Sequence, residues 1–232
     1  MKSTMMSSPL LLTCMEERAG KLFPGVEIVS ARPDGSVQRC TYGDLHRRSR
    51  QLTAALQRAG IAQGDRVATL MWNEQEHLEA YFGVPAAGAV VHTLNLRLHP
   101  DEIAYIVNHA QDRFLIVDDV LLDIFEQIQP HVKFERILVV DSGTGKLPPG
   151  CEWYEGFLTE CGGTPNYPAL AEDDAAAMCY TSGTTGSPKG VVYSHRALAL
   201  HSLAISLPDQ LAMSCHDTVL PAMSMFHANA WG

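Results

Sequence analysis

Between residues 66 and 140, short apolar runs alternate with longer segments whose apolar side chains recur at helical spacing. The runs predict buried strands, at 66–71, 89–93, 113–117 and 136–140. The segments between them predict helices, at 74–87, 100–110 and 120–130. Strands that alternate with helices in this way predict an α/β fold, with a layered, mostly parallel sheet that helices cover on both faces.

Two short strands are expected before this pattern, at residues 26–30 and 37–41. The turn residues Pro33-Asp34-Gly35 lie between them, so the pair predicts a β-hairpin. Thr41 begins a capping-box pattern and Gly60 is a typical helix stop. A helix is therefore expected between these two residues.

Glycines and prolines interrupt the alternation over residues 141–174. This break predicts a junction between a first α/β subdomain with N-terminal strands, residues 1–140, and the start of a second, residues 175–232. The elements expected after the junction are strands at 175–180, 190–194 and near 218–220, and a helix at 195–207.

The composition narrows the class of protein. A hydrophobic content of 46% suits a globular chain, and a formal net charge of −9 argues against a general nucleic-acid binder, which needs excess Lys and Arg. A mononucleotide site remains compatible, because it needs only a few local donors. Six scattered cysteines without a CxxC pair favour a reduced, cytoplasmic setting. The apolar patch at 9–12 is too short for a signal peptide or a transmembrane segment.

The segment 180–190 combines hydroxyl side chains, glycines and one lysine directly after an apolar strand. Backbone amides and hydroxyls in such a loop can converge on phosphate oxygens while Lys189 supplies a positive charge. The segment differs from the P-loop of NTPases, because Lys189 precedes Gly190 and an apolar run instead of opening a helix. Composition alone is equally compatible with a flexible connection.

The order Thr-Ser-Gly-Thr-Thr-Gly-Ser-Pro-Lys-Gly at 181–190 resembles the phosphate-binding signature of the adenylate-forming superfamily. That superfamily includes acyl-CoA synthetases, luciferases and peptide-synthetase adenylation domains. The runs at 226–232 and 92–100 resemble the medium- and long-chain fatty acyl-CoA synthetase branch, so the likeness covers roughly residues 20–232. Ser224 departs from the proline usual before Met-Phe-His, which predicts a looser loop around His227.

The resemblance implies a reaction in which a carboxylate attacks the α-phosphate of Mg-ATP and CoA then displaces AMP. It implies that seven loop residues bind the nucleotide: Thr181, Ser182, Gly183, Thr184, Thr185, Gly186 and Lys189. The hydroxyls of Ser182, Thr184 and Thr185 would hold the β- and γ-phosphates with Lys189. Thr181 would offer its hydroxyl to Mg²⁺, which prefers hard oxygen ligands.

Further residues follow from the same likeness. His227 would orient the acyl carboxylate or a phosphate, and it joins Lys189 as a predicted catalytic residue. The backbone at Ala228 would lie near the nucleotide, and Trp231 would line or gate an acyl tunnel. A lone histidine or tryptophan is otherwise more often an ordinary hydrogen-bonding or core residue. The adjacent carboxylates at 118–119 and 173–174 are expected to be solvated turn caps, without a catalytic role.

The expected function is therefore that of an acid–thiol ligase that activates a fatty acid with ATP, Mg²⁺ and CoA. The chain would be the incomplete N-terminal region of that enzyme and inactive alone, because the superfamily's later motifs have no counterpart before Gly232. The expected partners are the fatty acid and CoA, with a homodimer as one expected assembly. Two alternatives stay open: a noncatalytic binding or dimerisation module, and another adenylating ligase such as an aryl-CoA ligase.

Overall fold

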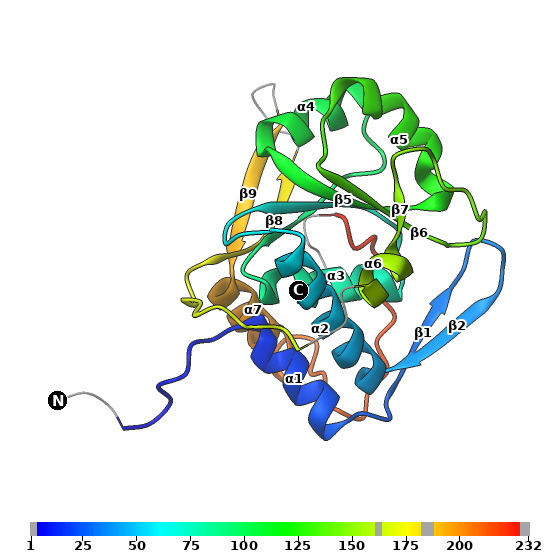
Figure 1. The fold of residues 1–232 in the computed structure, drawn as a ribbon. Coiled ribbons are helices and arrows are strands. Elements are labelled where there is room, and N and C mark those ends of the chain that lie inside the picture. The colour runs from blue at the N-terminus through cyan, green and yellow to red at the C-terminus, as the bar shows by residue number, and fades with distance from the viewer. Residues whose placement is uncertain (1–3, 161–163, 182–187, 228–232) are drawn as a thin grey trace.

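Seven strands form one sheet in the computed structural model, which describes residues 4–160, 164–181 and 188–227 (Figure 1). The strand order is β7-β6-β5-β3-β4-β8-β9, and every neighbouring pair is parallel except β8 and β9. The strands are β3 Arg66–Leu70, β4 Val90–Thr93, β5 Asp112–Asp118, β6 Arg136–Val140, β7 Glu152–Trp153, β8 Ala175–Thr181 and β9 Lys189–Ser194. The predicted α/β fold with a mostly parallel sheet is confirmed.

Helices cover both faces of this sheet, as parallel strands require. One face packs against α2 Tyr42–Arg58, α3 Gln75–Ala86 and α6 Tyr154–Glu160. The other packs against α4 Pro100–Ala110 and α5 Leu122–Ile128, with the 3₁₀ turns Asp119–Leu121 and Gln129–His131 on either side of α5. Successive strand residues point to opposite faces, so Val67 joins the first core and Ala68 the second.

The close approach of α2 and α3 depends on a glycine. A Cβ atom at Gly83 would lie 2.8 Å from the carbonyl oxygen of Ser49 and 2.9 Å from a methyl carbon of Leu52. A hydrogen bond also joins the two helices at this point, because the Thr53 hydroxyl of α2 donates to the Gly83 carbonyl of α3 at 2.9 Å. A larger residue at Gly83 would push the two helices apart and open the first core.

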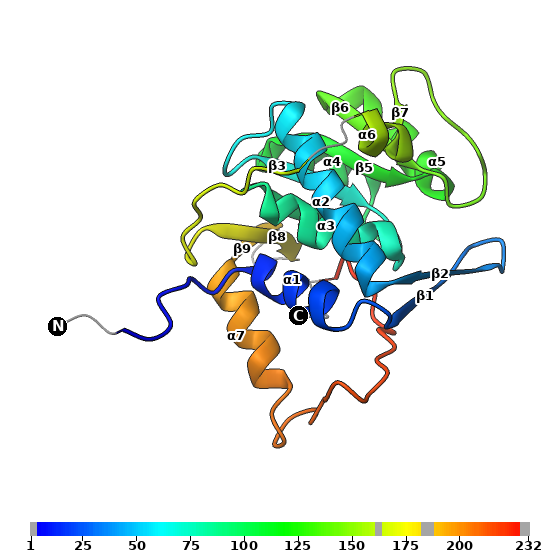
Figure 2. The same cartoon turned by 60° about the horizontal axis from the view of Figure 1, so that its bottom comes forward.

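The predicted hairpin is present as β1 Glu27–Ala31 and β2 Val37–Thr41, which pair antiparallel. It projects beside the body of the molecule in both views (Figures 1 and 2). Thr41 also caps α2: its hydroxyl accepts the Asp44 amide at 3.1 Å, and the Asp44 carboxylate accepts the Thr41 amide at 3.1 Å. The predicted capping box is thereby confirmed.

Other expectations are corrected. No strand forms near 218–220 in the part of the chain that the structure describes, where Val219 and Leu220 are 62% and 86% exposed. A strand needs a hydrogen-bonding neighbour, and the described sheet ends at β9. Helix α1, Leu12–Leu22, was not predicted; it lies on the α2 side of the sheet together with α7, His195–Ile205 (Figures 1 and 2).

The segment 141–174 contains two elements of its own, β7 and α6, and β7 extends the sheet beyond β6. After this segment the chain returns to the opposite half of the sheet, where β8 pairs with β4. One sheet therefore spans the expected junction, and the division at 140 and 175 stays a prediction. Among the described residues, no helix is long and apolar enough to cross a bilayer.

Stability should fall on acidification because of His77. Its ring is fully buried, with one nitrogen 3.0 Å from the Thr69 hydroxyl and the other 2.9 Å from the Trp72 carbonyl. Burial lowers the pKa of His77 to about 4, against about 6.5 in an unfolded chain. Between these values the unfolded state binds the extra proton, so the stabilisation is present above pH 6.5 and about 3 kcal/mol is lost as the pH falls toward 4.

The measurement is urea unfolding of the chain at several pH values between 7 and 4.5. The control is His77→Gln, which fills similar space but does not titrate. We expect the variant to be less stable than the wild type at pH 7 and the gap to narrow as the pH falls. A gap of constant size across this range would show that His77 is not the titrating group.

Candidate functional site

Thr181 and Lys189 form the two ends of the predicted phosphate loop. Thr181 is the last residue of β8, Lys189 is the first of β9, and their Cα atoms are partners in the antiparallel ladder. Both side chains are exposed. Ser182, Gly183, Thr184, Thr185 and Gly186 lie outside the described residues. The loop therefore starts and ends at one point on the carboxyl edge of the sheet, where α/β folds bind ligands.

Tyr180 supports the base of this loop. Its ring lies over Gly190, where an added Cβ would approach the ring's Cζ to 3.1 Å. Its hydroxyl is hydrogen bonded to Nδ1 of His109, at the end of α4, over 2.6 Å. Burial raises the pKa of Tyr180, and Asp112 and Tyr105 raise it further, so the hydroxyl keeps its proton. Tyr180 thus ties both strands of the loop's base to α4.

A buried acid–imidazole pair lies beneath Tyr180. Nδ1 of His92, on β4, is 2.8 Å from both carboxylate oxygens of Asp112, on β5, and both side chains are fully buried. The His92 ring is 5.3 Å from the Tyr180 ring. Burial raises the pKa of Asp112, and the adjacent His92 opposes that rise. The Tyr180 ring therefore packs beside a polar pair that is buried away from water.

His227 ends a segment that crosses the same edge of the sheet. Phe226 is buried, and its carbonyl accepts a hydrogen bond from the Thr93 hydroxyl at 3.1 Å. Thr93 is the last residue of β4 and pairs with Cys179 of β8, two residues before Thr181. The structure therefore brings Thr181, Lys189 and the exposed His227 to the ends of neighbouring strands. Ala228 and Trp231 lie outside the described residues, and the roles of all these site residues stay predictions.

The carboxylates at 118–119 are not solvated caps, so that expectation was wrong. Asp118 and Asp119 are both buried, and Asp118 accepts the Trp72 amide at 2.7 Å. Asp119 accepts three amides from the segment 142–145, at 2.7 to 3.0 Å. Asp119 is buried because this segment folds back over the end of β5. Asp174 does act as a turn cap, accepting the Ala171 amide at 2.8 Å.

Thr181 is the residue that the resemblance implies for Mg²⁺. Within the described ranges, no group of three or more His, Cys, Asp or Glu side chains is arranged to hold a metal ion. The exposed hydroxyl of Thr181 is one hard oxygen donor at the mouth of the loop. Mg²⁺ keeps several waters and is often held largely by substrate phosphates, and the role of Thr181 toward it stays a prediction.

A family model described as "AMP-binding enzyme" matches residues 16–232. The chain belongs to this family. Two curated relatives are the long-chain-fatty-acid–CoA ligase of Thermus thermophilus, 50% identical over 230 residues, and the medium-chain-fatty-acid–CoA ligase of Ectopseudomonas oleovorans, 41% identical over 238. The matches cover 99% and 100% of this chain but only 41% and 43% of those relatives.

The fold of this AMP-binding enzyme chain also matches solved structures. The long-chain-fatty-acid-CoA ligase FadD1 of Archaeoglobus fulgidus superposes with a TM-score of 0.82 over 96% of this chain and 44% of that chain. Its sequence identity of 22% makes this a likeness of fold alone. The chain thus spans less than half of the length of the relatives and the structure named here.

Proposed function

We propose that this chain supplies the pyrophosphate side of the active site in an ATP-dependent fatty acid–CoA ligase of the AMP-forming type. The observation that carries the proposal is the 50% identity over 99% of the chain to a fatty acid–CoA ligase. The geometry supports it, because the ends of the Ser/Thr/Gly loop and His227 lie at one edge of the sheet. The enzyme would serve fatty acid metabolism in the cytoplasm.

In the proposed reaction, a carboxylate oxygen attacks the α-phosphorus of ATP and the bond to the bridging oxygen breaks. Pyrophosphate leaves with the electron pair, and the CoA sulfur then attacks the acyl carbonyl, loses its proton and releases AMP. Lys189 would neutralise the β- and γ-phosphates together with the loop hydroxyls. Thr181 would hold Mg²⁺, which supplies further charge neutralisation. His227 would orient the carboxylate, and Trp231 would line the acyl site.

The function is tested on the complete gene product by fatty acid-dependent exchange of pyrophosphate into ATP and by CoA-dependent release of AMP. Activity with medium- or long-chain acids supports the proposal, whereas activity with aryl acids alone favours the alternative ligase. A folded product that binds but activates no acid favours the noncatalytic module. We also propose that the 232 residues by themselves release no AMP above background, because the chain spans 41% of the ligase to which it is 50% identical and adenylation needs all reacting groups held together. Sedimentation of the complete product tests the proposed homodimer.

Replacing Lys189 by Ala should slow acid-dependent pyrophosphate exchange by roughly 10- to 100-fold, because the phosphates lose a positive charge. Since Lys189 is exposed at the start of β9, the fold should be unaffected. The matched control is Lys133→Ala, another exposed lysine far from the loop in sequence. Unchanged exchange and unchanged affinity for Mg-ATP in Lys189→Ala would contradict the assigned role.

A further inference from the structure

Asn73 binds three backbone groups of the segment that leads to His227. It lies in the turn between β3 and α3, at the carboxyl edge of the sheet. Its Nδ2 donates to the carbonyls of Pro221, at 3.1 Å, and Met223, at 2.7 Å. Its Oδ1 accepts the amide of Met225 at 2.7 Å. Both ends of the side-chain amide are used, and because the partners are two acceptors and one donor, they fix its orientation.

The segment 221–227 returns to the sheet after α7 and ends in a turn, and it is drawn in red in Figure 2. Its two buried side chains point into different cores: Met225 joins the core on the α2 face and Phe226 joins the core on the α4 face. The Tyr81 hydroxyl donates to the Met225 carbonyl at 2.6 Å. The segment therefore straddles the edge of the sheet immediately before His227.

Met225 and Phe226 hold the segment to the sheet by burial, whereas Asn73 holds it by hydrogen bonds to its backbone. It bonds to the residues on each side of Ser224, the position where the resemblance predicts a looser loop. The carbonyl of Ser224 in turn accepts the His227 amide at 3.0 Å, which closes the turn that presents His227. Pro221 and Met223 are exposed, so water can replace Asn73 at their carbonyls. Losing Asn73 should thus release the turn without unfolding the core.

We propose that Asn73 is a positioning residue for the ligase reaction, which acts by holding the turn at 224–227 so that His227 stays at the carboxyl edge of the sheet, where Thr181 and Lys189 begin and end the phosphate loop. This inference rests on the proposed function, in which His227 orients the carboxylate or a phosphate. A catalytic group must be held to a fraction of an ångström, so a hydrogen-bonded support next to it affects the rate more than the stability.

The kinetic test compares Asn73→Ala, His227→Ala and the double variant in the complete gene product, by acid-dependent pyrophosphate exchange. We expect Asn73→Ala to lower kcat about tenfold, with a smaller change in the KM for ATP. In the His227→Ala background, Asn73→Ala should cause no further loss, because the group that it positions is gone. The matched control is Asn108→Ala, which removes another side-chain bond to a backbone carbonyl, that of His131.

The structural test is amide hydrogen exchange in the 232-residue chain. Asn73→Ala should speed exchange at the Met225 amide about tenfold, since its acceptor is removed, and exchange in β3 and β5 should stay as in the wild type. Additive losses in the double variant, or unchanged kcat in Asn73→Ala while His227→Ala is slow, would overturn the inference. A complete gene product without acid-dependent exchange would contradict the proposed function instead, and exchange at Met225 would then decide whether Asn73 holds the turn.

Discussion

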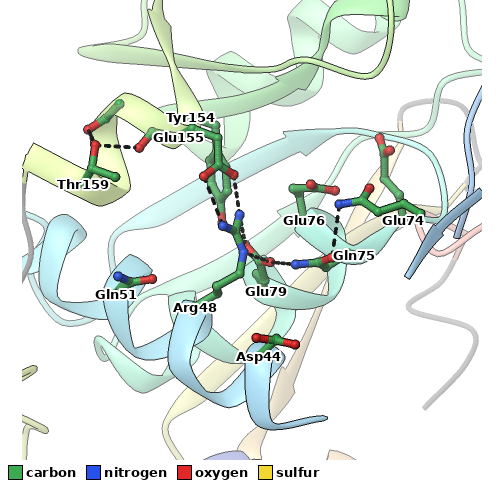
Figure 3. A network of polar contacts seen from close by, with 12 residues as sticks. Asp44, Arg48, Gln51, Glu74, Gln75, Glu76, Glu79, Tyr154, Glu155 and Thr159 are labelled. Carbon is green, nitrogen blue, oxygen red and sulfur yellow. Dashed lines mark hydrogen bonds and ion pairs between the residues drawn. The ribbon is translucent and has the colours of Figure 1, made fainter. Parts of the chain in front are cut away.

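Replacing Arg48 by Met should lower the free energy of unfolding by about 3–5 kcal/mol, because it leaves a buried carboxylate without its cation. Arg48, on α2, binds both oxygens of Glu79, on α3, through Nε at 2.6 Å and Nη2 at 3.2 Å (Figure 3). Glu79 is fully buried and also accepts bonds from Gln75, at 2.7 Å, and the Tyr154 hydroxyl, at 2.8 Å. Arg48 reaches Glu155 on α6 as well, so one guanidinium joins three helices.

The effect should depend on pH in a definite direction. Burial already raises the pKa of Glu79, and Arg48 opposes this rise. Without Arg48 the pKa rises further, so the folded variant binds a proton that the unfolded chain releases above about pH 4.3. The stability of Arg48→Met relative to the wild type should therefore recover as the pH falls from 8 to 5.

Urea unfolding at pH 8, 6.5 and 5 measures this. The matched control is Arg47→Met, the preceding residue on α2, whose ion pair with Asp44 is largely exposed and should matter far less. The double variant Arg48→Met, Glu79→Gln should be less destabilised than the sum of the two single changes, because it leaves no unpaired charge. Equal losses in Arg48→Met and Arg47→Met would refute the assignment of a buried ion pair.

The central strands could be predicted from the sequence because their surroundings are simple. A parallel strand buried on both faces is a continuous apolar run, as in β3 and β5, and an amphipathic helix must follow to cover it. Two elements escaped this logic. Strand β7 has only two residues, and it forms by pairing with β6, which its own sequence does not indicate. Helix α1 begins at the end of an apolar patch that is too short to show a helical pattern.

The position of the loop between β8 and β9 could be predicted because the order of its residues is local information, and its phosphate-binding role stays a prediction. The groups that hold the site in place are not local. Asn73 and the Met225 amide are 152 residues apart in the sequence, and Tyr180 and His109 are 71 apart. In the sequence, a single Asn after a strand indicates only a turn. The backbone groups that Asn73 binds are visible only in the folded chain.

The buried state of Asp118 has the same origin. It lies among Glu74 and Glu76, from the start of α3, and Arg32, from the hairpin, so three separate segments of the chain meet at this point. Adjacent carboxylates on a turn give no sign that an arginine of the distant β1–β2 hairpin will approach them. Such a cluster forms only when the sheet edge, the start of α3 and the hairpin meet.

Arg32 is the cation of that cluster and attaches the hairpin to the sheet. It follows β1 directly, and its guanidinium binds Glu74, Gln38 and, at 2.9 Å, Glu76. Both carboxylates belong to the start of α3 and are buried. Burial raises the pKa of Asp118 well above its usual range, and the adjacent Glu74 raises it further. The guanidinium of Arg32 therefore pairs with Glu74 and Glu76, while Asp118 favours its protonated form beside them.

Replacing Arg32 by Met should destabilise the chain by about 3 kcal/mol, near the lower end for a broken buried pair, because the hairpin can swing away and let water reach the acids. Amide exchange in β1 and β2 should accelerate more than exchange in β5. The loss should be larger at pH 8 than at pH 5, since Asp118, whose pKa is already raised by burial, can take up a proton more readily as the pH falls. The stability of Arg32→Lys should lie between that of the wild type and that of Arg32→Met, because lysine keeps the charge but not the planar guanidinium.

The control on the same hairpin is Arg39→Met, whose partner Glu27 and own side chain are 58% and 59% exposed. If Arg32→Met leaves both the unfolding free energy and the exchange of β1 unchanged, the hairpin is held by its apolar contacts and not by this arginine.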